Sequence, residues 1–562
     1  MKKSVLLIVT FFMFGSSIWS ASKLVPNTAV PAKLQKYYEP QGTEIDVPMD
    51  QVYRSNSLRD AVGTLIDSSK NGYGLFMAET NPIAASGNNV YITYRQWAAS
   101  GSSGVLGSAL STDGGNTWAT SENINLTGAA RYPSALLSEN YPVAAWNETG
   151  TGGGTSMGRA YYTFDMGGFT PLAYYPPQDI LDSPLSKDAW INKSRLNYDN
   201  FGNMVINAFY TDWTTRQKYH AKSSTATPWE GTVLSWDATT SFLNLTDFLG
   251  YETSNYTSEG SFDMNEAGVG YFVISAYAAN ATQTANHTLF IKRTIDFGTT
   301  WSDWYYLSDS AINDYFTSTV TNPLDDGSSL PVGWTPFIGY DLSTIVDDNG
   351  GLHVFAGVLP SAEGSVYPQW DQSCGLYHFG LSNAAFFAGS GAVEPNINFI
   401  SSMRDSWAYE SPGWDSNVWS SARDAALDGH LYVVHYKMSD DGSTGAYLDL
   451  FGSYSSDYGQ TWSESINITG TQTNLEDETD PHLAPIASNG TVRIMYQVPD
   501  WNIPTVEPAV VSEDYLNRIY YHEFTFDVIL NNQVDLTSGS GCTDWGDALV
   551  LSPVSGEFTN DG

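Results

Sequence analysis

An eight-residue turn occurs three times in this sequence, and it constrains the fold more than any other feature. Its pattern is Ser/Thr-x-Asp-x-Gly-x-Thr-Trp, and a fourth, degenerate copy keeps the acid and the glycine but ends in Phe. The Asp side chain can fold back onto backbone N–H groups, Gly permits the positive φ of a tight turn, and Trp anchors the returning strand. Each copy therefore predicts the turn of a β-hairpin. The copies are Ser111–Trp118, Thr294–Trp301, Ser455–Trp462 and the degenerate Thr163–Phe169.

A longer repeat lies beneath these turns. A short strand, a Gly/Asn turn and a second, apolar strand recur every 50 to 80 residues or so, which is typical of a repeat architecture. Most units continue into a third strand, and the eight-residue turns fall between the third and fourth strands. The seven second strands are predicted at Val90–Tyr94, Val143–Trp146, Met204–Phe209, Tyr271–Ile274, Leu352–Phe355, Leu431–His435 and Val492–Tyr496.

This pattern predicts an all-β fold, a β-propeller of four-stranded blades, because such blades bury their faces against one another around an axis. Seven units favour seven blades. The segment from about Thr43 to Asp67 is expected to supply the outer strand of the last blade.

The turn pattern is that of the Asp box. The chain therefore resembles the sialidase-like Asp-box (BNR) repeat β-propeller family, with Asp113, Asp165, Asp296 and Asp457 as the structural box acids. Because sialidases have six-bladed rings, the resemblance leaves six blades as the alternative to seven. It also implies a substrate clamp of three arginines, a tyrosine nucleophile with a glutamate, and an aspartate as acid/base.

The termini predict export. Residues 1–20 have the charged, apolar and small-residue layout of a signal peptide, and no cysteine follows the apolar run as in a lipoprotein. We expect a linker over residues 21–42, the propeller over 43–530, and a tail over 531–562 that is either a sorting segment or a truncated further domain. No later stretch is apolar enough to span a membrane. The protein is thus expected to be secreted or exposed at the cell surface.

Charge and motif content exclude several functional classes. The net charge of −37, from 61 acidic and 24 basic residues, repels nucleic acid and anionic membranes. No phosphate-binding loop and no metal-ligand spacing is present. We therefore expect no required cofactor. Acidic turns such as Asp347–Gly350 offer oxygen ligands that could bind calcium, although turn chemistry alone explains these residues. The two cysteines, Cys374 and Cys542, are interpreted either as a disulfide that attaches the C-terminal tail to the ring or as two unpaired thiols.

The connections sort onto two rims of the ring, because antiparallel strands alternate in direction. The turn rim carries the short connections between strands 1 and 2 and between strands 3 and 4. The long-loop rim carries the other connections, which are long and varied, and insertions on one rim are typical of a binding face. The innermost strands are expected to begin on the long-loop rim and to bring a candidate catalytic set to the channel mouth: Arg131, Arg195, Arg423, Glu259, Tyr340 and Asp341.

Two departures weigh against a sialidase. The family's Arg-Ile-Pro motif is missing, since none of Arg54, Arg59 and Arg95, the arginines before Asp113, is followed by Ile-Pro. The three candidate arginines also occur in units two, three and six, a distribution that does not match the family. The alternative interpretation is that each arginine is structural and binds loop carbonyls or a neighbouring acid.

An aromatic cluster supplies a second candidate site. Flat aromatic faces stack on sugars and are enriched at binding surfaces, so the cluster predicts a glycan platform; the alternative is packing between blades. Its members are Trp407, Tyr409, Trp414 and Trp419.

The sequence thus predicts a secreted propeller that recognises carbohydrate or another extracellular partner, glycan or protein, through its long-loop rim. An exo-sialidase or another glycosidase is the alternative, and a structural or adhesive surface platform is the third hypothesis. An enzyme requires the three arginines around one point, a lectin-like binder requires exposed tryptophans, and burial of both sets in structural contacts favours the platform. The sequence does not define the oligomeric state.

Overall fold

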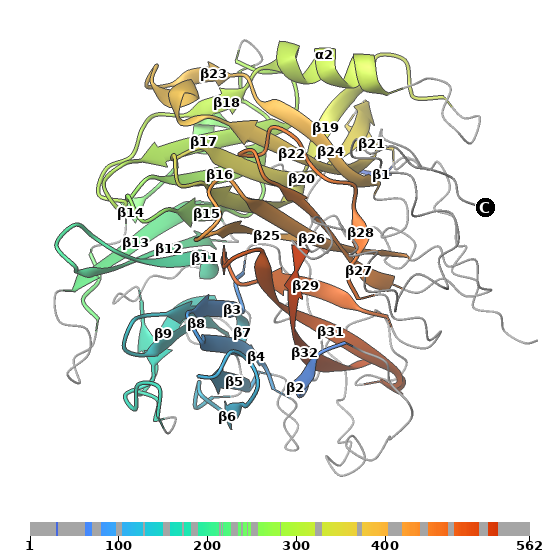
Figure 1. Cartoon of the computed structure of the whole chain (residues 1–562). Coiled ribbons are helices and arrows are strands. Elements are labelled where there is room, and N and C mark those ends of the chain that lie inside the picture. Colours follow the sequence, from blue (N-terminus) through green and yellow to red (C-terminus); the bar gives the residue numbers. More distant parts are fainter. Residues whose placement is uncertain are drawn as a thin grey trace, which may run out of the picture.

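The chain forms a ring of seven β-sheets. The structure is a computed structural model, and it describes residues 30–31, 62–69, 80–96, 104–127, 130–149, 158–170, 173–180, 189–212, 215, 217–225, 234–237, 240–243, 245–248, 257–280, 283–320, 329–362, 364–367, 374–402, 419–438, 448–469, 477–504 and 515–526. Figure 1 shows the blades in sequence order around the ring, from blue at the bottom through green and yellow to red, where the two ends of the order meet. The predicted seven-bladed propeller is confirmed, and the six-bladed alternative is wrong.

Each blade consists of four antiparallel strands, from the channel outward. Blade 1 is β3 (Ile83–Ser86), β4 (Asn89–Arg95), β5 (Leu106–Ser111) and β6 (Ala119–Ser121); blade 2 is β7 (Ala130–Leu137), β8 (Pro142–Thr149), β9 (Gly158–Phe164) and β10 (Gln178–Asp179); blade 3 is β11 (Ala189–Tyr198), β12 (Met204–Asp212), β13 (Lys218–Thr225) and β14 (Thr240–Ser241); blade 4 is β15 (Ser261–Met264), β16 (Gly270–Ala276), β17 (Thr288–Thr294) and β18 (Tyr305–Leu307). Blade 5 is β19 (Thr335–Val346), β20 (Leu352–Ala362), β22 (Gly375–Leu381) and β24 (Asn396–Ser402); blade 6 is β25 (Trp419–Asp424), β26 (Leu431–Met438), β27 (Leu448–Ser455) and β28 (Ile466–Asn467); blade 7 is β29 (Thr479–Leu483), β31 (Thr491–Pro504), β32 (Tyr515–Thr525) and β2 (Thr64–Ser69).

A few short elements extend these blades. Two of the short strands join neighbouring blades: β23 (Gly391–Val393) pairs with β18, and β30 (Ile486–Ala487) pairs with β25. Blade 5 also carries β21 (Ser365–Val366) and β1 (Val30–Pro31). The helices of the described chain are α2 (Asp309–Thr319) and the 3-10 turns η2 (Leu245–Asp247) and η3 (Asn383–Phe386).

The ring closes by pairing the N-terminal part of the chain with its last blade. Strand β2 is the outermost strand of blade 7 and runs antiparallel to β32, with Thr64 opposite Tyr521. The expected closure is therefore confirmed for Thr64–Asp67; residues 43–61 lie outside the described chain.

The hydrophobic core is divided among the blade interfaces. Each of the seven interfaces has its own cluster of buried apolar side chains, contributed mainly by the second and third strands of the two facing blades. This arrangement explains the nearly continuous apolar runs of the second strands, because both of their faces are buried. A blade therefore depends on its two neighbours for stability.

The eight-residue turns have the geometry expected from their sequence. In the first, Asp113 Oδ1 accepts from Ser111 Oγ and from Thr117 N, each at 2.8 Å, and Asp113 Oδ2 accepts from Thr117 Oγ1 at 2.6 Å. The turns at Asp296 and Asp457 repeat these bonds. All three link the third strand of a blade to its fourth, as predicted. In the degenerate copy, Asp165 Oδ1 accepts from Gly167 N at 2.7 Å and from Ala173 N at 2.9 Å.

The segment that follows every third strand also docks on the preceding blade. Six of these segments place an aromatic ring against an aromatic residue of that blade's second or third strand, and in the seventh the Tyr174 hydroxyl lies 2.9 Å from the Tyr91 hydroxyl, so the set forms a closed circle of contacts on the turn rim. We call these seven residues the aromatic anchors. They are Trp118 on Tyr521, Tyr174 on Tyr91, Trp236 on Tyr162, Trp301 on Phe209, Phe386 on Tyr271, Trp462 on Phe355 and Phe526 on Tyr432.

We expect Asp113→Ala to lower the melting temperature at pH 7 and to lose this effect in acid. Hydrogen bonds from Thr117 lower the pKa of Asp113 to about 2. A carboxyl whose pKa is lower in the folded than in the unfolded protein stabilises the fold at pH values above the unfolded pKa, which is about 3.9. That contribution disappears as the pH falls toward 2. Melting curves from pH 7 to pH 2.5 test this.

The matched control is Asp303→Ala, which removes an exposed carboxylate just after the second turn. A loss at Asp113 that is equal at every pH, or no larger than the loss at Asp303, would contradict the assigned role.

Candidate functional site

The innermost strands distribute the predicted catalytic residues over both ends of the channel. Arg131 is the second residue of β7 and Glu259 precedes β15, so both lie toward the long-loop rim. Arg195 pairs with Asn207 near the turn-rim end of β11. Arg423 pairs with Leu431 beside the β25–β26 turn. The expectation that Arg195 and Arg423 lie at the long-loop rim is wrong: β11 begins at Ala189 and β25 at Trp419, which puts both arginines toward the turn rim.

Arg195 is bound to a carboxylate inside the channel. Its Nε donates to Asp263 Oδ1, and both side chains are almost completely buried. Asp263 Oδ2 in turn accepts from Val346 N of blade 5 at 2.7 Å. In the amide orientation that satisfies its neighbours, Asn81 of blade 1 accepts from Arg195. Arg195 thus connects three blades.

Arg423 is held in the same way at the turn-rim mouth. Its guanidinium donates to Asp348 Oδ1 at 2.8 Å and to Glu266 Oε1, which lie in the first turns of blades 5 and 4. Burial lowers the pKa of Arg423, but the carboxylates of Glu266, Asp263 and Asp348 outweigh it and raise this pKa overall. Arg423 therefore stabilises the ion-pair network between blades, in agreement with the structural interpretation of the arginines.

The long-loop ends of the innermost strands carry irregularities. The register shifts between Arg131 and Ser134 in β7, between Ile191 and Ser194 in β11, between Ile338 and Leu342 in β19, and between Thr479 and His482 in β29. Bulges redirect side chains and are frequent beside functional sites. Two of the displaced residues, Tyr132 and Asp480, have positive φ values of 50° and 54°. Four of seven blades thus depart from regular pairing at one end.

Buried charged side chains gather at the same end. Lys218, at the start of β13, is fully buried; its Nζ lies 3.5 Å from Glu259 Oε2 of blade 4 and donates to Thr211 Oγ1 at 2.8 Å. Asp341 and Asp480, on the bulges of β19 and β29, are buried as well. Sequence reasoning identified Glu259 and Asp341 but missed Lys218, because its role depends on a partner in the next blade.

Glu148 is a second residue that sequence reasoning missed. It lies at the end of β8, and its carboxylate accepts from Thr127 Oγ1 and from Trp146 Nε1. Burial raises the pKa of Glu148 despite these bonds and the nearby charge of Arg131. Buried carboxyls with raised pKa values are frequent at functional sites, although they also occur in structural networks. Only the Trp146–Glu148 spacing could have indicated it.

Tyr340 and Trp419 lie in packed surroundings. The ring of Tyr340 contacts His287 and Phe337 at centroid distances of 5.1 and 5.5 Å. Trp419 is 5 % exposed in the core between blades 5 and 6, and its Nε1 donates to Phe355 O at 3.1 Å. For Trp419 the geometry agrees with packing between blades. Trp407, Tyr409 and Trp414 lie outside the described residues.

The acidic turn 347–350 has protein partners. Asp347 Oδ1 accepts from Gly351 N at 2.7 Å and Asp348 binds Arg423. Over the residues that the structure describes, no three His, Cys, Asp or Glu side chains are grouped as a metal would require. Calcium binding stays a prediction. Cys374 is buried in the core between blades 5 and 6, and Cys542 falls outside the described chain.

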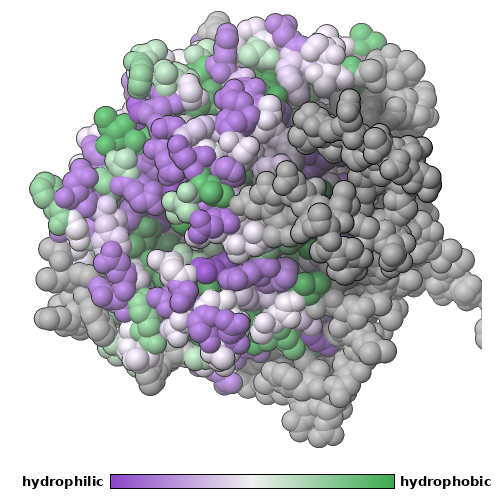
Figure 2. All heavy atoms as spheres, in the orientation of Figure 1, coloured by the Kyte–Doolittle hydropathy of each residue, from purple (hydrophilic) through white to green (hydrophobic). Residues whose placement is uncertain are grey.

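The described surface is mixed in polarity. Figure 2 shows hydrophobic side chains on the visible face in small groups between hydrophilic ones. Scattered apolar residues of this kind are normal for a protein surface. Of the helices in the described ranges, none combines the length and the apolar character needed to cross a bilayer. The channel ends are therefore more informative about function than this face.

No family model matches the chain, and no curated protein sequence is similar to it. Among solved structures, a polysaccharide lyase, Uly1, is 10 % identical, with a TM-score of 0.43, over 89 % of this chain and 98 % of its own. The sialidase of Trypanosoma rangeli in complex with the inhibitor DANA is 10 % identical, with a TM-score of 0.38, over 73 % of this chain and 57 % of its own. The α-L-arabinanase of Penicillium chrysogenum complexed with arabinobiose is 11 % identical, with a TM-score of 0.35, over 70 % and 93 %. Similarity at this level does not assign a function.

Proposed function

We propose that this chain is an exported β-propeller that binds carbohydrate, or another extracellular partner, at the long-loop end of its channel. The observation that carries the proposal is the asymmetry between the two rims. On the turn rim, the aromatic anchors and the ion pairs of Arg423 connect neighbouring blades. On the long-loop rim, four bulged innermost strands and the buried Lys218–Glu259 pair provide charged groups at the ends of rigid strands.

A glycosidase is the second candidate. Glu259 lies just before the innermost strand of blade 4 and Asp341 lies on that of blade 5, both toward the long-loop end, and two carboxylates are the usual acid–base set for glycoside cleavage. A sialidase is less well supported, because Arg195 and Arg423 bind Asp263, Glu266 and Asp348 toward the opposite end. These arginines are poorly placed to bind a sugar carboxylate together with Arg131.

The test is binding of the purified protein to an oligosaccharide array, followed by affinity measurements with Asp341→Asn and Glu259→Gln. We expect each variant to weaken binding at least about tenfold, because a charge-assisted hydrogen bond contributes about 1.5–3 kcal/mol. Unfolding curves for each variant separate lost binding from lost fold.

Glu464→Gln is the matched control, since it removes one exposed carboxylate on the turn rim. Release of sugar from a fluorogenic sialic acid glycoside, with Arg423→Ala beside it, tests the enzyme alternative. Binding that is unchanged in Asp341→Asn and Glu259→Gln would contradict the proposed site. The absence of both binding and turnover would favour a structural or adhesive platform.

A further inference from the structure

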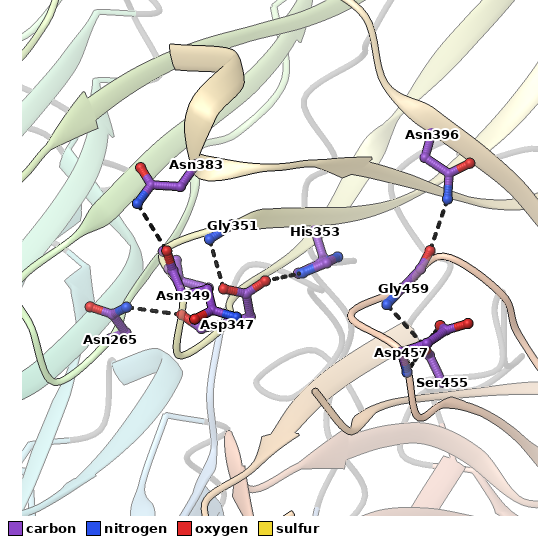
Figure 3. A network of polar contacts seen from close by, with 12 residues as sticks. Asn265, Asp347, Asn349, Gly351, His353, Asn383, Asn396, Ser455, Asp457 and Gly459 are labelled. Atoms are coloured by element: carbon purple, nitrogen blue, oxygen red, sulfur yellow. Dashed lines mark hydrogen bonds and ion pairs between the residues drawn. The ribbon is translucent and has the colours of Figure 1, made fainter. Parts of the chain in front are cut away.

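Four side chains form a continuous chain of hydrogen bonds between blades 5 and 6, an interface that we call the 5–6 seam. Trp462 Nε1, in the third eight-residue turn, donates to His378 Nδ1 of β22 at 3.1 Å. His378 Nε2 lies 3.0 Å from His353 Nδ1 of β20. His353 Nε2 lies 3.1 Å from Asp347 Oδ2, and Figure 3 shows this last link beside the turn that carries Gly459.

The order of donors fixes the proton positions in this chain. An indole N–H can only donate, so His378 Nδ1 accepts and its hydrogen is on Nε2. That hydrogen points to His353 Nδ1, so the hydrogen of His353 is on Nε2 and points to the Asp347 carboxylate. Every bond is therefore satisfied only when both imidazoles are neutral.

One additional proton breaks the chain. A charged His378 would direct an N–H at the N–H groups of Trp462 and Asn398, and a charged His353 would direct one at His378. Burial and the neighbouring His353 lower the pKa of His378 well below its ordinary value. The charged groups around the pair do not change the conclusion that both rings are neutral. Burial raises the pKa of Asp347, but the bond from His353 outweighs it and keeps this pKa below its ordinary value. The adjacent Asp348 carboxylate is bound to Arg423.

The turn of blade 6 rests directly on this pair. Gly459 packs so closely that a Cβ added to it would lie 2.8 Å from His353 Nδ1 and 2.8 Å from His378 Cε1. Its carbonyl accepts from the Asn396 side chain of blade 5 at 3.0 Å (Figure 3). It also accepts from the Asn398 side chain at 3.1 Å. The imidazoles thus form part of the surface on which blade 6 is held.

We propose that His353 and His378 form a proton-operated latch that holds the eight-residue turn of blade 6 on blade 5 and releases the 5–6 seam as the pH falls below about 6.5. The seam is held closed with both rings neutral, and its opening exposes both rings to protonation. Acid therefore favours the open seam. This proposal is independent of the proposed ligand site, which lies at the opposite rim.

Hydrogen exchange measured by mass spectrometry at pH 7.5 and 5.5 tests the latch. The peptides of interest cover residues 347–353 and 455–462, and the internal control covers 111–118, an equivalent turn that docks on Tyr521. After correction for intrinsic rates, we expect protection in the 5–6 seam to fall about tenfold more than in the control, as the uptake of one proton by the opened seam requires. An equal loss in the two turns would overturn the proposal.

Two variants separate the titration of His378 from the bond to Trp462. His378→Gln keeps a donor for His353 and an acceptor for Trp462 but cannot titrate at this pH, so the extra loss of protection should shrink. Trp462→Phe keeps an aromatic ring but removes the N–H that opposes a proton on His378 Nδ1, so protection in the 5–6 seam should be lower at pH 7.5 and the extra loss at pH 5.5 should be smaller. A full acid response in His378→Gln would contradict the latch.

A second measurement covers the case in which these variants do not fold. Nitrogen NMR of histidine-labelled protein at pH 7.5 should show both rings with hydrogen on Nε2 only. Hydrogen on Nδ1 of either ring would overturn the proposal.

Discussion

Replacement of Arg195 by Met is expected to lower the free energy of unfolding by about 3–5 kcal/mol, the usual cost of removing one partner from a buried ion pair. The substitution leaves the carboxylate of Asp263 buried without its guanidinium. Part of the Asp263 charge would still be stabilised by Val346 N, which donates to its other oxygen. Urea unfolding followed by tryptophan fluorescence measures the effect.

Two further variants make this prediction specific. Asp263→Asn, added to Arg195→Met, removes the uncompensated charge and should recover part of the loss, so the double-mutant cycle should give a large coupling energy. Arg493→Met breaks the more exposed pair with Glu523, whose two side chains are 18 % and 38 % exposed, and should cost no more than about 1 kcal/mol. Equal losses at Arg195 and Arg493 would contradict the account of the channel.

Gly115→Ala should destabilise the ring by about 3 kcal/mol, whereas Gly114→Ala in the same turn should cost about 1 kcal/mol. Both glycines have positive φ, 75° for Gly114 and 90° for Gly115, so both variants carry backbone strain. Only Gly115 packs against the preceding blade: its added Cβ would collide with the ring of Tyr521, while an added Cβ at Gly114 meets nothing within 4 Å.

The difference between Gly115→Ala and Gly114→Ala measures how much the packing of this turn on blade 7 stabilises the protein, apart from the backbone strain within the turn. Tyr521 cannot easily move aside, because its ring contacts Trp118 at 4.9 Å and its hydroxyl donates to Glu523 at 2.8 Å. Thermal unfolding of the two variants measures the difference. Equal losses would show that this turn stabilises only its own hairpin.

The repeat architecture could be predicted because each of its strands and turns has a recognisable local sequence pattern. Every predicted second strand falls within an observed one, since an apolar run buried on both faces and bounded by Gly or Asn turns is a strong signal. The eight-residue turns also fixed the third and fourth strands around them. Helix α2 was missed because only Ile312 and Phe316 of its eleven residues are buried, which is a weak helical pattern.

The candidate site was harder to predict because it depends on contacts between blades. The start of β25 was misplaced since Trp419-Ser-Ser-Ala lacks the β-branched residues that usually mark a strand, and Arg423 was assigned to the wrong rim as a result. Lys218 has no local motif that distinguishes it from other strand residues, and Glu148 has only its spacing from Trp146. The bulges cannot be recognised before the partner strand is known.

The aromatic anchors also determine where the chain could be cut. Each anchor follows the third strand of its own blade and reaches back to the blade before it, so a break between a third strand and its anchor would separate the two. A break on the long-loop rim would leave all seven anchors attached. The present ring is closed between β32 and β2 on the turn rim, beyond the anchor Phe526, which therefore stays on its own strand. A circularly permuted chain with its new ends in a long-loop connection would also keep every contact that locks the blades, and the same connections can accept an inserted domain without opening the ring.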